Sequence, residues 1–197
     1  YTQTGGIWQT VYLESRGSTF IQQGHILPDI DQQRAEVRLT LNAPAAGTHT
    51  VKVTAKHGEQ TVEASQEATL QAGENQASVA LPIPDQALWS PDSPALYDTG
   101  IELLQNAKTV GTVRTYFGMR KISRGTYGGS AQEYILLNNK PIYLRGALNQ
   151  AYTPEGLYAY PSVEYMRNDI LKAKEFGINM LRIHIKPDDP RFLYLAD

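Results

Sequence analysis

Between residues 19 and 122 the chain consists of short runs in which every second residue is apolar. This alternation is typical of strands that bury one face and leave the other in solvent. Three runs show it well, at residues 35–42, 48–55 and 75–83. The side chains expected to face inward are Val37, Leu39 and Leu41 in the first run, Val51, Val53 and Ala55 in the second, and Ala77, Val79, Leu81 and Ile83 in the third.

Turn-forming stretches separate these runs, among them NAPAAGT, KHGEQ, QAGEN and QNAKT. About seven strands in roughly 100 residues, with a turn every 8–12 residues, is the pattern expected of an immunoglobulin-like β-sandwich. The chain holds no cysteine, so the disulfide of antibody domains is missing. The pattern therefore predicts the sandwich without implying kinship with antibodies.

The periodicity changes after Ile122. The segment RGTYGGSAQ at residues 124–132 is expected to be a loop, because it contains Gly and Ser. Residues 142–147 and 179–185 are short apolar runs, typical of strands that are buried on both faces.

Helical patterns follow each of these two strands. A first helix is expected between Ser162 as N-cap and Gly177 just past its end, because Val163, Met166, Ile170 and Ala173 recur at helical spacing. Asp189 as N-cap with Pro190 behind it predicts a second helix. The order strand, helix, strand, helix predicts two parallel strands joined by a right-handed crossover.

Composition narrows the classes of partner. The 18 Lys and Arg residues nearly balance the 20 Asp and Glu residues without a basic block, which argues against nucleic acid. No apolar run approaches the roughly 20 residues that span a bilayer, so no membrane partner is expected. The four histidines lack ligand spacing, and neither a metal nor a cofactor is expected. The lack of cysteine leaves the localisation open, because periplasmic and secreted proteins can also lack disulfides.

Four segments, in order, carry a resemblance to a known family. They are TGGIWQTVYLE, LWSPDSPALYDTGIEL, TYFGMRKI, and finally LLNNKPIYLRGALNQ with DILKAKEFGINMLRIHI and DPRFLYLAD. Together they resemble the large multi-domain enzymes of glycoside hydrolase family 2, which include β-galactosidases, β-glucuronidases and β-mannosidases. The resemblance covers nearly the whole chain.

The resemblance implies a division of the chain into three parts. Residues 1–16 correspond to the last strand of a sugar-binding jelly-roll domain and residues 17–122 to the immunoglobulin-like sandwich. Residues 123–197 correspond to the N-terminal part of a (β/α)8 TIM-barrel catalytic domain. The expected fold is thus mainly β, with a sandwich followed by the first β-α-β-α units of a barrel, and the chain is expected to be an internal fragment of a larger enzyme.

The implied function is that of a retaining β-glycosidase, which hydrolyses O-glycosidic bonds in carbohydrates with two carboxylates. In the family both are glutamates on later barrel strands, which would lie beyond Asp197. The fragment is therefore expected to hold no catalytic residue and to be inactive alone. The alternative is a stand-alone immunoglobulin-like carbohydrate-binding or adhesion module, in which the last 75 residues are a degenerate extension.

Candidate site residues lie where the two barrel strands end. In MLRIHI, Leu181, Ile183 and Ile185 are expected to face the helices, so that Arg182 and His184 point into the barrel. The resemblance implies that Arg182 holds the nucleophilic glutamate, while a purely structural arginine is the alternative. For His184 a hydrogen-bonded core histidine competes with a sugar contact.

The loop after the first strand supplies the other candidates. Asn149, Gln150 and Tyr152 lie where a substrate loop is expected, in NQAYTP, which replaces the His-rich segment of many β-galactosidases. Arg145 is either packing or site support. Tyr158 and Tyr160 are further candidates for sugar contact, whereas a solvated Lys186 and packing roles for Trp8 and Trp89 are the favoured interpretations.

The two barrel strands also bear on assembly. Their apolar faces need cover, and their open edges can pair with another chain. Self-association of the fragment is therefore expected, with docking onto its own sandwich as the alternative.

Overall fold

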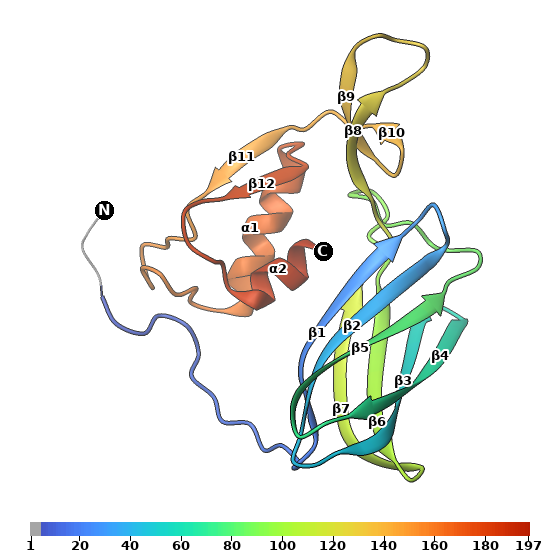
Figure 1. The fold of residues 1–197 in the computed structure, drawn as a ribbon. Coiled ribbons are helices and arrows are strands. Elements are labelled where there is room, and N and C mark those ends of the chain that lie inside the picture. Colours follow the sequence, from blue (N-terminus) through green and yellow to red (C-terminus); the bar gives the residue numbers. More distant parts are fainter. Residues whose placement is uncertain (1–4) are drawn as a thin grey trace. The chain divides into compact units, whose positions relative to one another are not determined.

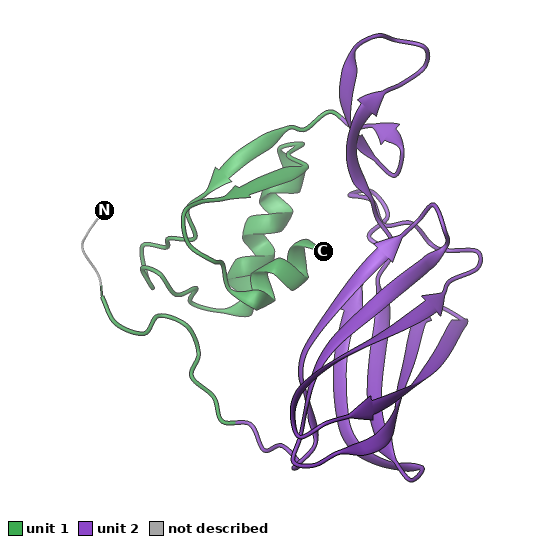
Figure 2. Cartoon of the chain, viewed as in Figure 1, with its two compact units in different colours: residues 1–13, 143–197 green, residues 14–142 purple. Residues whose placement is uncertain are grey.

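The computed structural model describes residues 5–197, which form two compact units (Figure 2). The larger unit contains residues 14–142. The smaller unit combines residues 5–13 with residues 143–197, so segments from both ends of the described chain pack together.

The larger unit contains two antiparallel sheets of long strands (Figure 1). One sheet has the order β1-β2-β5 and the other the order β4-β3-β6-β7. The strands are β1 (Phe20–Asp29), β2 (Arg34–Ala43), β3 (Gly47–His57), β4 (Gln60–Leu70), β5 (Gly73–Pro82), β6 (Tyr97–Gln105) and β7 (Lys108–Phe117). The seven strands expected from the alternation are thus confirmed.

The core of this unit lies between the two sheets, where alternate side chains of both are buried together. All three side chains predicted to face inward from β2 are at most 1% exposed, and those predicted in β3 are 0% exposed. Of the third set, Val79, Leu81 and Ile83 are buried and Ala77 is half-buried. The period of two along each strand therefore placed the core correctly.

A small three-stranded sheet completes the larger unit. It consists of β8 (Ile122–Thr126), β9 (Glu133–Leu137) and β10 (Lys140–Pro141), in the order β10-β9-β8. The prediction of a loop at residues 124–132 is therefore wrong for residues 124–126, because residues 122–126 pair with residues 133–137 as a hairpin. Asp31 fixes this sheet by accepting hydrogen bonds from Lys121 at 2.5 Å and from Asn139 at 2.8 Å.

In the smaller unit two short strands are parallel neighbours, β11 (Gly146–Asn149) and β12 (Met180–Ile183). Between them in the chain runs α1 (Val163–Glu175), and α2 (Pro190–Ala196) follows β12. The predicted caps are confirmed. Ser162 Oγ accepts from the Tyr165 N–H at 3.0 Å, and Asp189 Oδ1 accepts from the Arg191 N–H at 2.8 Å.

Three expectations for this unit are corrected. The first strand begins at Gly146 instead of Ile142, and residues 142–145 lie outside any strand. Neither strand is buried on both faces, because exposed and half-buried positions alternate along each. Ile185 was expected to face the helices but is 84% exposed, since β12 ends at Ile183 and the alternation stops with it.

The chain is thus mainly β, with a strand-helix-strand-helix segment at its end. Residues 5–19 form no strand, because a strand needs a hydrogen-bonded neighbour and none of the described strands pairs with this segment. None of the helices in residues 5–197 has the length and apolar character needed to cross a membrane.

Candidate active-site edge

The candidate site lies at the carboxyl ends of β11 and β12, which the parallel pairing brings together. Asn149 ends β11 opposite Ile183, and the next residue of the second strand, His184, donates its N–H to the Asn149 carbonyl at 2.9 Å. The His184 ring nitrogen Nδ1 lies 3.1 Å from Gln150 Oε1. Three of the predicted site residues, Asn149, Gln150 and His184, are therefore direct neighbours.

A buried carboxylate connects the loops around these residues. Asp188 is 4% exposed, and its Oδ2 accepts hydrogen bonds from Asn149 Nδ2 at 3.1 Å and from the Tyr160 hydroxyl at 3.3 Å. Its Oδ1 accepts from the Asp189 N–H at 2.8 Å. Both carboxylate oxygens are thus engaged, which satisfies the need of a buried charge for partners.

Burial raises the pKa of two groups in this network, Asp188 and Tyr160. It raises the pKa of the Asp188 carboxyl, against the opposing effect of the Asp189 N–H bond and the nearby Lys186 ammonium. Burial likewise raises the pKa of the Tyr160 phenol, and the neighbouring Asp188 charge acts in the same direction. Tyr160 therefore stays protonated at neutral pH and remains a hydrogen-bond donor to Asp188.

The loop that carries the tyrosines is fixed by its own hydrogen bonds. Thr153 and Leu157 exchange two backbone bonds at 2.8 and 2.9 Å, and Thr153 Oγ1 accepts from the Gly156 N–H at 3.0 Å. Gly156 is required at this point because a Cβ there would overlap the Ala159 carbonyl oxygen. The site loop is thereby a tight and locally specified turn.

Aromatic rings gather beside this loop. The ring of Tyr158 makes edge contacts with Tyr152, centre to centre 5.7 Å, and with Trp8 at 6.4 Å. The Lys186 ammonium lies 4.8 Å from the centre of the Trp8 ring and 5.3 Å from that of Tyr158. Lys186 is half-buried, so the expectation of a solvated surface lysine does not describe it.

The two predicted arginines differ in their surroundings. Arg145 donates from Nε to the Gly177 carbonyl at 2.5 Å, and its N–H bonds to Asn179 Oδ1 at 2.8 Å, which favours the packing interpretation. Arg182 is exposed on β12, and no carboxylate of residues 5–197 forms an ion pair with it.

Sequence reasoning missed Asp188, which is the centre of the network. The available signal was its position in KPDDP, a few residues after the carboxyl end of a strand. Trp89 packs as expected, because the Arg120 guanidinium lies 4.5 Å from its ring centre. Within the described part of the chain, no group of three or more His, Asp or Glu side chains could hold a metal.

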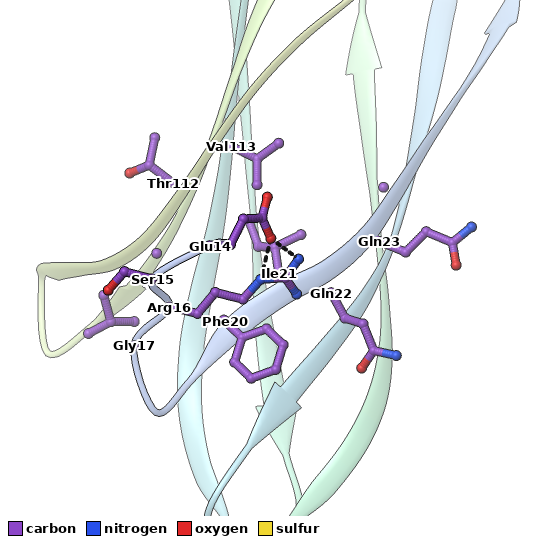
Figure 3. Close-up of a pocket in the computed structure, with 13 residues that line it drawn as sticks. Glu14, Ser15, Arg16, Gly17, Phe20, Ile21, Gln22, Gln23, Thr112 and Val113 are labelled. Atoms are coloured by element: carbon purple, nitrogen blue, oxygen red, sulfur yellow. Dashed lines mark hydrogen bonds and ion pairs between the residues drawn. The ribbon is translucent and has the colours of Figure 1, made fainter. Parts of the chain in front are cut away.

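A separate hollow of about 480 Å³ lies in the larger unit, between the start of β1 and β7 (Figure 3). Arg16 Nε donates to Glu14 Oε2 at 2.7 Å, and the guanidinium lies 5.1 Å from the centre of the Phe20 ring. The one carboxylate among the lining residues is therefore neutralised, and the amides of Gln22 and Gln23 are neutral. This hollow offers no pair of acid and base groups.

Comparison with known proteins places this geometry in context. A β-galactosidase of Oenococcus oeni is 26% identical over 204 residues, which cover 98% of this chain and 19% of that protein. A putative β-glucuronidase of Formosa agariphila is 27% identical over 178 residues, 89% of this chain and 15% of that protein. The chain thus spans about a fifth or less of the length of these relatives.

Solved structures share the fold. A glycosyl hydrolase family 2 member from Bacteroides cellulosilyticus superposes with a TM-score of 0.78 at 18% identity, over 92% of this chain and 26% of that one. A family 2 β-galacturonidase from Eisenbergiella tayi bound to galacturonate gives a TM-score of 0.74 at 23% identity, over 92% and 32% of the two chains. Residues 19–120, just over half of the chain, match the family described as Glycosyl hydrolases family 2, and the chain belongs to that family.

Proposed function

We propose that this chain supplies the linking sandwich and part of the catalytic domain of a retaining β-glycosidase. The observation that supports this most is the meeting of Asn149, His184 and Asp188 at the carboxyl ends of two neighbouring parallel strands. Barrel enzymes build their active sites at that end of their strands. Membership in a family of glycosyl hydrolases makes carbohydrate the substrate class.

The proposed architecture follows the family order. Residues 17–122 form the immunoglobulin-like sandwich, whose strand orders β1-β2-β5 and β4-β3-β6-β7 fit that description. Residues 123–197 hold the first β-α-β-α units of a TIM barrel, and residues 1–16 end a jelly-roll domain. Of the segment 1–16, residues 1–4 lie outside the residues that the structure describes.

The chemistry is assigned to groups outside this chain. A retaining enzyme uses one carboxylate as acid and base and a second as nucleophile, about 5–5.5 Å apart, and needs no cofactor. Both are proposed to be glutamates on later barrel strands. The present residues then bind and position substrate, with Gln150, His184 and Tyr152 facing sugar hydroxyls and Arg182 holding the nucleophile. Asn149 supports the site through its hydrogen bond to Asp188.

A comparison of the full-length protein with the 197-residue chain tests this function. The full-length protein is expected to release nitrophenol from 4-nitrophenyl β-glycosides, and the 197-residue chain is expected to be inactive. Sugar binding without hydrolysis by the full-length protein would contradict the proposal and favour a binding module. The similar proteins are named for neutral sugars and for acidic sugars. The substrates to be tested are therefore β-galactosides, β-glucuronides and β-galacturonides.

Self-association of the 197-residue chain is a further part of the proposal. The two-stranded sheet has open edges, and apolar side chains near it are exposed, namely Tyr143, Leu148, Met180 and Ile185. Open edges and exposed apolar groups favour pairing with a second copy. Light scattering over a range of concentrations should show a dimer, and a monomer at every concentration would contradict this.

A further inference from the structure

The Lys186 side chain is held in one place by two aromatic rings. It lies three residues past the end of β12, at the same edge as Asn149 and His184. Its ammonium is within 6 Å of the ring centres of Trp8 and Tyr158, close enough for cation–π attraction to both. Lysine is usually a flexible point charge, so this arrangement fixes where its positive charge lies.

The ammonium has no counter-ion of its own in this unit. No carboxylate of residues 5–197 comes within ion-pair distance of Lys186. Asp188 lies near enough to be influenced by it, yet both oxygens of Asp188 are engaged by Asn149, Tyr160 and a backbone N–H. Attraction to ring faces leaves the N–H donors of an ammonium available for an anion.

Partial burial strengthens any ion pair that this ammonium forms. Lys186 is half-buried, and the attraction between unit charges rises as water is displaced from around them. A fixed, half-buried and unpaired cation at a sugar-binding edge selects for a negative group on the sugar. A neutral sugar would leave that cation desolvated without a partner, which costs binding energy.

We propose that Lys186, held by Trp8 and Tyr158, binds the anionic group of an acidic sugar, so that the enzyme prefers charged substrates. This inference rests on the proposed function, because the site must bind a glycoside. The shared chemistry is a singly charged oxyanion, which is either a uronic-acid carboxylate or a sulfate ester. Trp8 is then a positioning residue that the segment preceding the sandwich contributes to the site.

The kinetic test uses the full-length protein and the variant Lys186→Met, which keeps an apolar stem beside the rings and removes the charge. Substrates are 4-nitrophenyl β-glucuronide, β-galacturonide, a 6-sulfated β-galactoside, and the neutral glucoside and galactoside. The wild type should prefer a charged substrate, and Lys186→Met should lower kcat/KM at least tenfold for that substrate alone. The better of the uronide and the sulfate identifies the anion.

The control is Lys172→Met, at an exposed position on α1, which should leave every kcat/KM within twofold of the wild type. Equal losses on charged and neutral substrates in Lys186→Met would overturn the inference and indicate a structural role. Hydrolysis of neutral substrates alone would overturn it while leaving the proposed function intact. No hydrolysis of any substrate would contradict the proposed function itself.

A binding measurement keeps the inference testable in that last case. The chain contains two tryptophans, Trp8 beside Lys186 and Trp89 in the larger unit, so their indole N–H signals in NMR report separately. Titration of the 197-residue chain with glucuronate or with galactose 6-sulfate should shift the Trp8 signal and leave Trp89 unchanged. Methyl glucoside should shift neither. Absence of a Trp8 shift with both anions, or the same shift in Lys186→Met, would overturn the inference.

Discussion

Asn149 donates a hydrogen bond from Nδ2 to Oδ2 of Asp188 at 3.1 Å and so joins the last residue of β11 to the segment that follows β12. The Tyr160 hydroxyl reaches the same oxygen from the intervening loop at 3.3 Å. Three segments that are separate in the sequence therefore share one buried carboxylate. The shape of the candidate site depends on that carboxylate keeping its donors.

Replacing Asn149 by Asp should destabilise the smaller unit. The substitution removes a donor and sets a second negative charge against the buried carboxylate of Asp188. Asp188 Oδ2 keeps the Tyr160 hydroxyl as a donor but loses one hydrogen bond to a charged group, which is worth about 1.5–3 kcal/mol. Urea unfolding followed by the NMR signal of Trp8, which lies in this unit, measures the change.

The control for this change is Asn168→Asp, at an exposed position on α1, which should leave the free energy of unfolding nearly unchanged. If Asn149→Asp is as stable as this control, the Asp188 network does not hold the loops. Acidification should partly restore the Asn149→Asp variant, because protonation of one carboxyl lets the two share a hydrogen bond.

Stability of the smaller unit should also depend on pH through Asp188. Burial raises its pKa in the folded state above the ordinary 3.8, so the folded state binds the proton more tightly than the unfolded state. The contribution is fully present below 3.8 and is lost as pH rises from there through the raised folded pKa. Asp188→Asn should flatten this decline.

Urea midpoints of wild type and Asp188→Asn, measured at half-unit steps between pH 3 and 7, give this difference directly. The stability of the wild type relative to the variant should fall as the pH rises. Asp169 behaves in the same direction, since burial raises its pKa too, and it is present in both proteins. A difference that is constant or that grows with pH would contradict the assignment.

The sandwich could be predicted from the sequence because its information is local. Each strand buries one face, so inward positions such as Val37 and Val51 follow from the period of two alone. The caps Ser162 and Asp189 were predictable for the same reason, since each bonds to an N–H two or three residues away.

The site network could not be predicted in this way, because its partners are far apart in the chain. Asp188 bonds to Asn149, which lies 39 residues earlier, and the periodicity of apolar residues does not predict contacts between such distant positions. Trp8 meets Lys186 across almost the whole described chain. The end of β12 was missed because IHI continues an apolar alternation that the backbone does not follow past Ile183.

The sandwich core gives a prediction with a matched control. Leu39 is 1% exposed between the sheets of the larger unit, whereas Leu13 belongs to the smaller unit and is fully exposed, so the same substitution has different costs at the two positions. Leu39→Ala should lower the free energy of unfolding of the larger unit by about 2–5 kcal/mol, through lost burial and the cavity left behind. Leu13→Ala should change it by less than about 0.5 kcal/mol. Thermal unfolding followed by circular dichroism compares the two variants, and equal midpoints would contradict the assigned core.

Replacing Arg182 is expected to affect catalysis and to leave stability unchanged. It is exposed and makes no ion pair in the described part of the chain, so Arg182→Lys should leave urea and thermal unfolding of the 197-residue chain unchanged. In the full-length protein the same change should lower kcat by roughly 100-fold or more, because an ammonium cannot reproduce the bidentate grip of a guanidinium on a carboxylate.

The control for Arg182→Lys is Arg167→Lys on α1, where the guanidinium is exposed and reaches Glu164 only at 3.8 Å, and it should keep wild-type rates. A higher KM with unchanged kcat would indicate that Arg182 stabilises the bound substrate and the transition state equally, and that it does not orient the nucleophile. Near-normal turnover in Arg182→Lys would remove this residue from the site, and the positioning of the nucleophile would then have to come from residues outside this chain.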